Sequence, residues 1–185
     1  MNALIINDLF KGNQLVELQS WLDLETPYEQ KNNWQSSPDG THMIKMCEEL
    51  NTFHKVLTDK SREVFQVHNL LPTFSSIDWV EPNVTIDSHR DSGPVQYTIL
   101  YNYFSDYKLE LKYKDDLLNL EQGQAVAYEG SQFEHEVNAN KGVSVRLYFN
   151  FATPDNYYFI LGNHTINGFE FPSGRLEQEV DINWL

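Results

Sequence analysis

The first third of the chain repeats its hydrophobic residues at helical spacing. One set follows Gly12 and Asn13 and comprises Leu15, Val16, Leu18, Trp21 and Leu22. A longer set follows Pro38-Asp39-Gly40 and comprises Met43, Met46, Cys47, Leu50, Phe53, Leu57, Val64 and Val67. Spacings of three and four residues place each set on one face of a helix. The sequence therefore predicts helices before Pro72 whose apolar faces pack on a sheet.

From Thr73 the pattern changes to short runs rich in β-branched and aromatic residues. The predicted strands are 74–80, 84–88, 95–104, 108–113, 124–128, 135–138 and 143–151, and Gly, Asn, Asp and Pro separate most of them. Helices followed by seven or more closely spaced strands predict a mainly β chain with N-terminal helices (α+β). The expected architecture is a double-sheet jelly roll that helices buttress on one face.

We expect a single domain over residues 1–185, because no repeat, low-complexity stretch or linker interrupts the chain. A mostly helical part at 1–72 would pack on a β core at 73–151. An aromatic and glycine-rich extension would follow at 152–185, where it could add edge strands or cover the mouth of a site.

Composition narrows the classes of function. The net charge of −14 opposes binding to phosphate backbones, so it argues against a nucleic-acid substrate. No apolar run approaches the length of about 18 residues that a membrane span needs. The single cysteine excludes an intrachain disulfide, and the start of the chain carries no signal-peptide pattern. We therefore expect a cytoplasmic protein with no membrane partner, while its oligomeric state stays open.

Three residues in the β region form a candidate metal site. His89 and Asp91 are two positions apart, so on an extended strand they point to the same side. His135 lies 46 residues after His89, which is far enough for the chain to return across a barrel. Two imidazoles and one carboxylate are the set that holds mononuclear non-haem iron(II) on one face and leaves the opposite face open.

Arg146 lies on the strand predicted at 143–151, which alternates strictly in polarity. Val145, Leu147, Phe149 and Phe151 occupy one face, whereas Ser144, Arg146, Tyr148 and Asn150 occupy the other. In a barrel with a ligand cavity the polar face would look inward. A guanidinium fixed there is suited to a bidentate grip on a carboxylate.

These residues together resemble the iron(II)- and 2-oxoglutarate-dependent oxygenases, in particular their prolyl-hydroxylase-like branch. The family pattern is His-x-Asp/Glu, then a distal His, then an Arg or Lys some ten residues later. Here it matches His89-x-Asp91, His135 and Arg146. The segments Trp79–Ile86 and His135–Val137 also look like those around the ligands in that branch. The resemblance covers roughly residues 74–151.

The resemblance implies a double-stranded β-helix, the jelly-roll variant of this family. It also implies Fe(II) on His89, Asp91 and His135, with Arg146 pairing with the distal carboxylate of 2-oxoglutarate. Members often carry Ser or Thr two residues after the arginine, where this chain has Tyr148. The Tyr148 hydroxyl could replace that contact, or its ring could narrow the pocket. A further co-substrate contact is expected from the strand at 95–103. Its period of two gives two candidate inward sets, which are Tyr97, Ile99, Tyr101 and Tyr103 or else Gln96, Thr98, Leu100 and Asn102. The sequence does not decide between the two sets, and we favour Tyr97 and Tyr101 because a phenol can donate a hydrogen bond to a carboxylate.

The resulting hypothesis is an Fe(II)/2-oxoglutarate-dependent dioxygenase, a hydroxylase with succinate and CO2 as co-products. O2 would be consumed, and the substrate would be an amino-acid or protein side chain, a peptide or another small molecule. Two alternatives stay open. One is a cupin-like metalloenzyme that needs no 2-oxo acid, although such proteins usually have more histidines in the barrel than His89 and His135. The other is a non-catalytic jelly-roll binding module.

Overall fold

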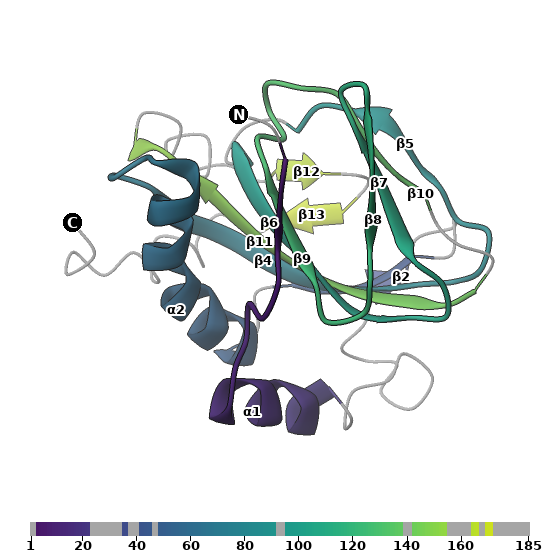
Figure 1. Cartoon of the computed structure of the whole chain (residues 1–185), viewed down its shortest axis with the longest axis horizontal. Coiled ribbons are helices and arrows are strands. Elements are labelled where there is room, and N and C mark those ends of the chain that lie inside the picture. Colours follow the sequence, from purple (N-terminus) through teal and green to yellow (C-terminus); the bar gives the residue numbers. More distant parts are fainter. Residues whose placement is uncertain are drawn as a thin grey trace.

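The structure is a computed structural model in which two antiparallel sheets face one another and two helices lie outside the larger sheet (Figure 1). It describes residues 3–22, 35–36, 41–45, 48–91, 95–138, 142–154, 164–166 and 169–171. The described part is mostly β, and its face-to-face sheets confirm the predicted jelly roll. No helix among the described residues is long and apolar enough to cross a membrane.

The larger sheet has the strand order β1-β9-β6-β11-β4-β3-β2. Its strands are β1 (Leu4–Ile6), β2 (Gln35–Ser36), β3 (Thr41–Lys45), β4 (Leu71–Val80), β6 (Tyr97–Ser105), β9 (Ala125–Tyr128) and β11 (Ser144–Ala152). β11 lies at the centre, between β6 and β4. The strand that carries Arg146 is therefore hydrogen-bonded on both sides, which fixes its inward and outward faces.

The smaller sheet has the order β5-β10-β7-β8. Its strands are β5 (Ile86–His89), β7 (Leu109–Tyr113), β8 (Asp116–Leu120) and β10 (His135–Asn138). Two further strands, β12 (His164–Ile166) and β13 (Phe169–Phe171), pair with each other within the predicted extension. The aromatic residues of the extension other than Phe169 and Phe171 lie outside the described residues.

The first third of the chain contains both expected helices but is less helical than predicted. α1 (Asn13–Leu22) and α2 (Glu48–Phe65) are confirmed. Met43, predicted to belong to the longer helix, lies in β3, and β1, β2 and β3 all extend the larger sheet. Met43 and Leu50 therefore belong to different elements, a strand and the helix that follows it, and their helical spacing is a coincidence. Met46 and Cys47 lie outside the described residues.

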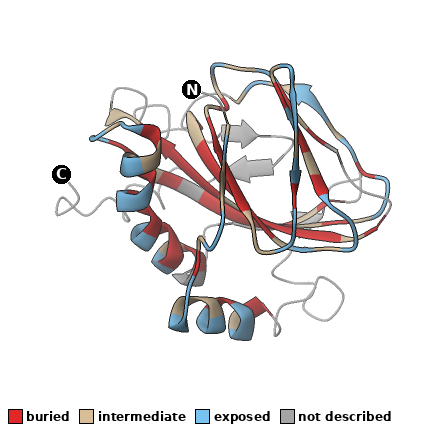
Figure 2. Cartoon of the chain, viewed as in Figure 1, coloured by how far each residue is buried: buried red, intermediate tan, exposed pale blue. Residues whose placement is uncertain are grey.

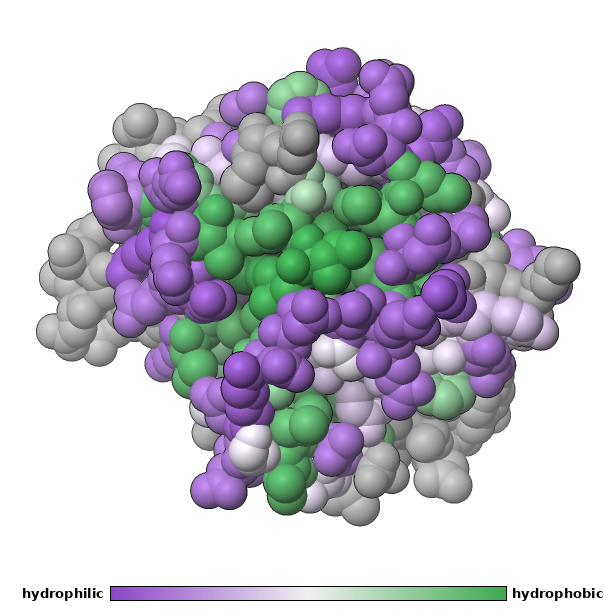
Figure 3. Space-filling view, in the orientation of Figure 1, coloured by the Kyte–Doolittle hydropathy of each residue, from purple (hydrophilic) through white to green (hydrophobic). Residues whose placement is uncertain are grey.

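Two hydrophobic clusters lie on opposite sides of the larger sheet (Figure 2). The outer cluster packs both helices against Ile77, Leu147, Phe149 and Phe151. The inner cluster fills the space between the sheets with residues that include Leu100, Leu111, Tyr113 and Val126. In surface view, hydrophobic side chains gather between β9 and β8 with hydrophilic borders (Figure 3). The inner faces of both sheets are thus available to enclose a site.

Candidate active site

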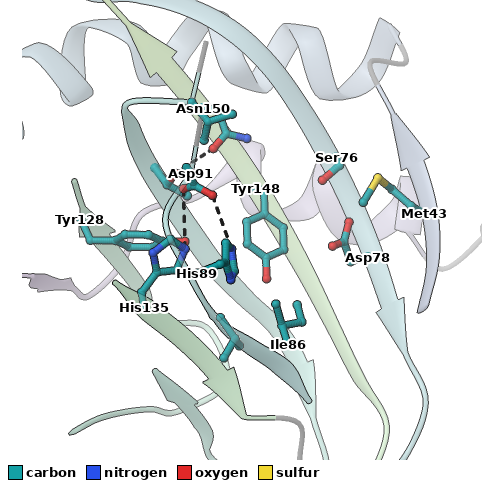
Figure 4. Close-up of a pocket in the computed structure, with 13 residues that line it drawn as sticks. Met43, Ser76, Asp78, Ile86, His89, Asp91, Tyr128, His135, Tyr148 and Asn150 are labelled. Atoms are coloured by element: carbon teal, nitrogen blue, oxygen red, sulfur yellow. Dashed lines mark hydrogen bonds and ion pairs between the residues drawn. The ribbon is translucent and has the colours of Figure 1, made fainter. Parts of the chain in front are cut away.

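His89, Asp91 and His135 meet at one end of the space between the sheets (Figure 4). His89 ends β5, His135 begins β10, and the two residues are direct partners in the antiparallel register. Asp91 follows β5 and lies between the rings. Its Oδ1 is 3.6 Å from His89 Nε2, and its Oδ2 is 3.6 Å from His135 Nε2. One donor atom from each residue lies within 4.8 Å of the others, so the predicted triad is brought together.

Backbone carbonyls orient both imidazoles. His89 Nδ1–H donates to the Asp87 carbonyl at 2.7 Å, and His135 Nδ1–H donates to the Phe133 carbonyl at 3.3 Å. Because each Nδ1 faces a backbone carbonyl, each Nε2 is the nitrogen that faces Asp91. Metal-ligating histidines are held in this way, through a hydrogen bond from the nitrogen that does not bind the metal.

The two rings differ in their electrostatic surroundings. Burial lowers the pKa of His135, against the opposing effect of the Asp91 carboxylate. The interaction with Asp91 raises the pKa of His89, which is more exposed, against the smaller effect of desolvation. A metal ligand must be the neutral imidazole. The pKa shifts therefore favour the neutral, metal-binding form at His135 and disfavour it at His89.

Gly130 backs the carboxylate of the triad. Its carbonyl accepts a hydrogen bond from the Asp91 N–H at 3.0 Å. A Cβ at this position would overlap the Asp91 carboxylate, so only glycine leaves room for the side chain as it is placed. In the sequence this residue is visible only as part of a turn before His135. Its role in positioning Asp91 becomes visible only when the two segments lie together.

The triad opens into a cavity of about 60 Å³ between the sheets. Its walls combine apolar side chains with a few polar groups. The lining residues are Met43, Ser76, Asp78, Ile86, His89, Asp91, Val95, Thr98, Tyr128, His135, Val137, Tyr148 and Asn150. A mostly apolar cavity with a small number of convergent polar groups is the usual form of a small-molecule site.

Arg146 and Tyr148 place unsatisfied polar groups deep in the same region. Arg146 is 0% exposed, and its Nε donates to Ser144 Oγ at 3.1 Å. Its Nη1 and Nη2 and the Tyr148 hydroxyl are buried without a hydrogen-bond partner among the described residues. Burial raises the pKa of Tyr148 to about 12, while the charge of Arg146 lowers it and that of Asp78 raises it. The phenol therefore stays protonated and can donate.

Comparison with solved structures identifies the fold. A prolyl-4-hydroxylase from Pseudomonas putida matches with a TM-score of 0.63 and 11% identity, over 82% of this chain and 92% of that one. A Trichoplax adhaerens prolyl hydroxylase in complex with a hypoxia-inducible-factor peptide matches with a TM-score of 0.64 and 15% identity, over 84% of this chain and 86% of that one. The chain has the prolyl-hydroxylase-like fold of the 2-oxoglutarate oxygenases.

A third solved structure supports the same fold, whereas comparisons of the sequence alone find no match. A 2-oxoglutarate-Fe(II) oxygenase family protein from Burkholderia pseudomallei matches with a TM-score of 0.62 and 10% identity, over 81% of this chain and 84% of that chain. No family model and no curated protein matches the sequence. At these identities the likeness establishes the oxygenase fold, and the chemistry depends on the residues of this chain.

Within this oxygenase fold, the structure places Tyr97 and Tyr101 away from the cavity. Both pack in the outer cluster beneath the helices, and neither lines the cavity. The opposite parity of β6 faces inward, so Thr98 lines the cavity in their place. Thr98 Oγ1 donates to Asn150 Oδ1 at 2.8 Å, which joins β6 to β11 across the cavity wall.

Several cavity residues carry no signal in the sequence. Tyr128 is 2% exposed, and its ring lies 4.9 Å from that of His135, so it shields this imidazole from water. Asp78, Ser76 and Met43 come from β4 and β3, where nothing in the local pattern separates a cavity residue from an ordinary strand residue. Tyr128 belongs to a short apolar strand that is buried on both faces, so its direction could not be predicted either.

Proposed function

We propose that this chain is an Fe(II)- and 2-oxoglutarate-dependent oxygenase that hydroxylates a small molecule or an amino-acid or peptide side chain. The observation that carries the proposal is the combination of the triad with buried donors of Tyr148, which lines the same cavity, and of Arg146 beside it, none of which has a hydrogen-bond partner among the described residues. A triad of this composition could also hold zinc, and a buried arginine can be purely structural. Together the two features supply one site for a divalent cation and a second for an anion.

The triad suits iron(II) in its chemistry and its spacing. The three donor groups come from one side, and their separations leave room for an ion between them. Two neutral imidazoles and one carboxylate favour a first-row divalent metal over Mg²⁺ or Ca²⁺, which prefer oxygen ligands. The apolar surfaces of Tyr128 and Ile86 near the site would exclude water from the remaining coordination positions.

The buried donors suit a dicarboxylic 2-oxo acid. Leaving the Arg146 guanidinium and the Tyr148 hydroxyl without partners would each be costly in a folded protein, since a buried polar group normally has one. A carboxylate could accept two bonds from the Nη atoms and a third from Tyr148. The tyrosine would thus replace the Ser or Thr that this family often has at the same position.

The reaction follows from these assignments. Bound Fe(II) supplies O2 activation, which couples decarboxylation of 2-oxoglutarate to oxidation of a substrate C–H bond. One oxygen atom enters succinate and the other enters the alcohol product, with CO2 released. His89, Asp91 and His135 would hold the metal, and Arg146 with Tyr148 would orient the co-substrate. A peptide substrate is compatible with the proposal, since a protein of the same fold binds a peptide.

Anaerobic titration with Fe(II), followed by 2-oxoglutarate, tests the proposal. We expect about one metal per chain and then the weak visible charge-transfer band of the ternary complex. His135→Ala should abolish the band, whereas Arg146→Ala should weaken 2-oxoglutarate binding and leave iron bound. Metal binding without the band would favour a cupin-like enzyme, and no metal binding would favour a binding module. Loss of iron in Arg146→Ala would refute the role given to the arginine.

Succinate release then addresses the substrate. Panels of free amino acids and peptides should stimulate release above the uncoupled background if the substrate belongs to those classes. Matched panels without a peptide or amino-acid group serve as the control.

A further inference from the structure

The end of the cavity away from the triad carries a second charge. Asp78 lies there with Ser76 and Met43, on the far side of the Tyr148 ring from the triad (Figure 4). Asp78 is 4% exposed and lines the cavity. Arg146, by contrast, does not line it, because Tyr148 stands on the same face two residues later. A ligand that extends from the triad would therefore meet Asp78 directly, and Arg146 only beyond Tyr148.

Asp78 and Arg146 are direct neighbours across two strands. They are register partners in the antiparallel pair of β4 and β11. Side chains at such positions leave the same face of the sheet with their Cβ atoms about 5 Å apart. Both charges act on the Tyr148 hydroxyl with opposite sign, which places all three groups in one environment. Among the described residues, a positive and a negative charge thus lie together beside the Tyr148 hydroxyl.

A mixed-charge environment is unfavourable for a second carboxylate. Like charges at short distance oppose one another, and burial weakens the screening that salt and water provide at a surface. The distal carboxylate of 2-oxoglutarate would gain from Arg146 and lose to Asp78. A 2-oxo acid with an uncharged tail would be neither strongly attracted to Arg146 nor strongly repelled by Asp78.

We propose that Asp78 is a specificity-determining residue for the co-substrate, because its carboxylate opposes the distal carboxylate of 2-oxoglutarate. The Asp78 charge thereby reduces the ratio by which the site binds this dicarboxylate more tightly than 2-oxo acids that lack the second carboxylate. The inference rests on the proposed function, since it concerns the pocket assigned to 2-oxoglutarate. It assigns Asp78 no part in holding the metal.

Calorimetric titration of the Mn(II)-loaded protein without O2 tests this assignment. The two probes are 2-oxoglutarate and 2-oxopentanoate, which has the same chain length and no distal carboxylate. Asp78→Asn, which keeps the volume and removes the charge, should bind 2-oxoglutarate at least about tenfold more tightly. Binding of 2-oxopentanoate should change by less than about twofold, since its tail is neutral. The ratio of the two dissociation constants is the decisive quantity.

Two controls make the result specific. Asp59→Asn removes the same charge from an exposed position on α2, so it should leave the ratio as in the wild type. Asp78→Ser, a smaller neutral variant, repeats the test if the asparagine variant does not fold. An unchanged or weaker affinity of the neutral variants for 2-oxoglutarate would overturn the inference. If the wild type holds Mn(II) but neither it nor the variants bind 2-oxoglutarate, the co-substrate proposal itself fails, and this inference fails with it.

Discussion

The two faces of β11 show how one strand can serve stability and binding separately. On the outer face, Phe149 and Phe151 are fully buried and pack against His54 of α2. His54 Nε2–H donates to the Asn150 carbonyl at 2.9 Å, so the polar group beneath the helix is satisfied. On the inner face, Arg146 is buried and Tyr148 is half-buried, and both have buried polar atoms with no hydrogen-bond partner among the described residues.

The difference indicates that the outer face stabilises the fold, whereas the inner face leaves buried polar groups unpaired at a cost in stability. The outer face follows the ordinary rule that buried polar groups are paired and apolar groups fill the space. The inner face departs from it, and such departures are expected where a ligand completes the structure. Substitutions on the two faces should therefore separate stability from ligand binding.

The largest expected effect on stability comes from the outer face. Phe149→Ala removes a ring that packs against Phe10 and His54, and it should lower the free energy of unfolding by about 3 to 5 kcal/mol. Urea denaturation followed by circular dichroism measures this loss. Tyr148→Phe, the neighbouring inner-face control, should cost far less, because it removes only an unpaired hydroxyl. Equal losses in the two variants would contradict the division between the faces.

Arg146→Met should affect binding while sparing stability. The Nη atoms of Arg146 have no hydrogen-bond partner among the described residues, so an apolar side chain of similar volume removes the cost of burying them unpaired. The same variant should bind 2-oxoglutarate about a hundredfold more weakly, because two charge-assisted hydrogen bonds are lost. Denaturation and calorimetry on one preparation give both values. A marked loss of stability would mean that the guanidinium has a structural partner in the folded chain.

Gly130→Ala tests the positioning of the inner site without altering a ligand. The added methyl group should displace the Asp91 carboxylate and weaken metal binding by about 10- to 100-fold, as the loss of supporting contacts usually does. Anaerobic competition with a coloured chelator measures the affinity. Gly123→Ala, at a turn with φ of 85° and nothing near its Cβ, provides a control that strains the backbone away from the triad. Unchanged metal affinity in Gly130→Ala would show that Asp91 can move without cost.

The smallest expected effect is the pH dependence of stability that comes from His54, which packs on the outer face of β11. Burial lowers the pKa of His54 from 6.5 to about 3, against the opposing effect of its bond to Asn150. Below pH 6.5 the unfolded chain therefore takes up a proton that the folded chain does not, and stability falls with pH until about 3. Between pH 6.5 and 5 this loss is about 2 kcal/mol. His54→Gln, whose amide can also donate to Asn150, should remove this part of the pH dependence in urea titrations.

The sequence predicted the triad because its pieces carry strong local signals. Two ligands at positions i and i+2 share a face in any extended strand, and His135 begins a run that alternates clearly. The alternation of β11 likewise predicted which face holds Arg146, and the cavity residues Tyr148 and Asn150 confirm that its polar face looks inward.

Other features could not be predicted, for identifiable physical reasons. β6 is buried on both faces, so its alternation does not say whether the set with Tyr97 and Tyr101 or the set with Thr98 faces the cavity. β8 was missed because the turn before it uses Lys114 at a φ of 57° in place of glycine or asparagine. Asp78 is a single acidic residue in a strand, and only the register with Arg146 reveals its surroundings.

A bulge in β6 opposite Arg146 limits where the length of the chain can change without disturbing the sheet. Between Val145 and Arg146 the pairing of β11 with β6 jumps from Phe104 to Asn102, so Tyr103 is an extra residue opposite the arginine. Such a bulge lets the strand change its phase at one point. A chain shorter by this single residue would have to exchange the inward and outward sides of one half of β6. Length changes should therefore be tolerated in the loops that join the strands and rejected at this position.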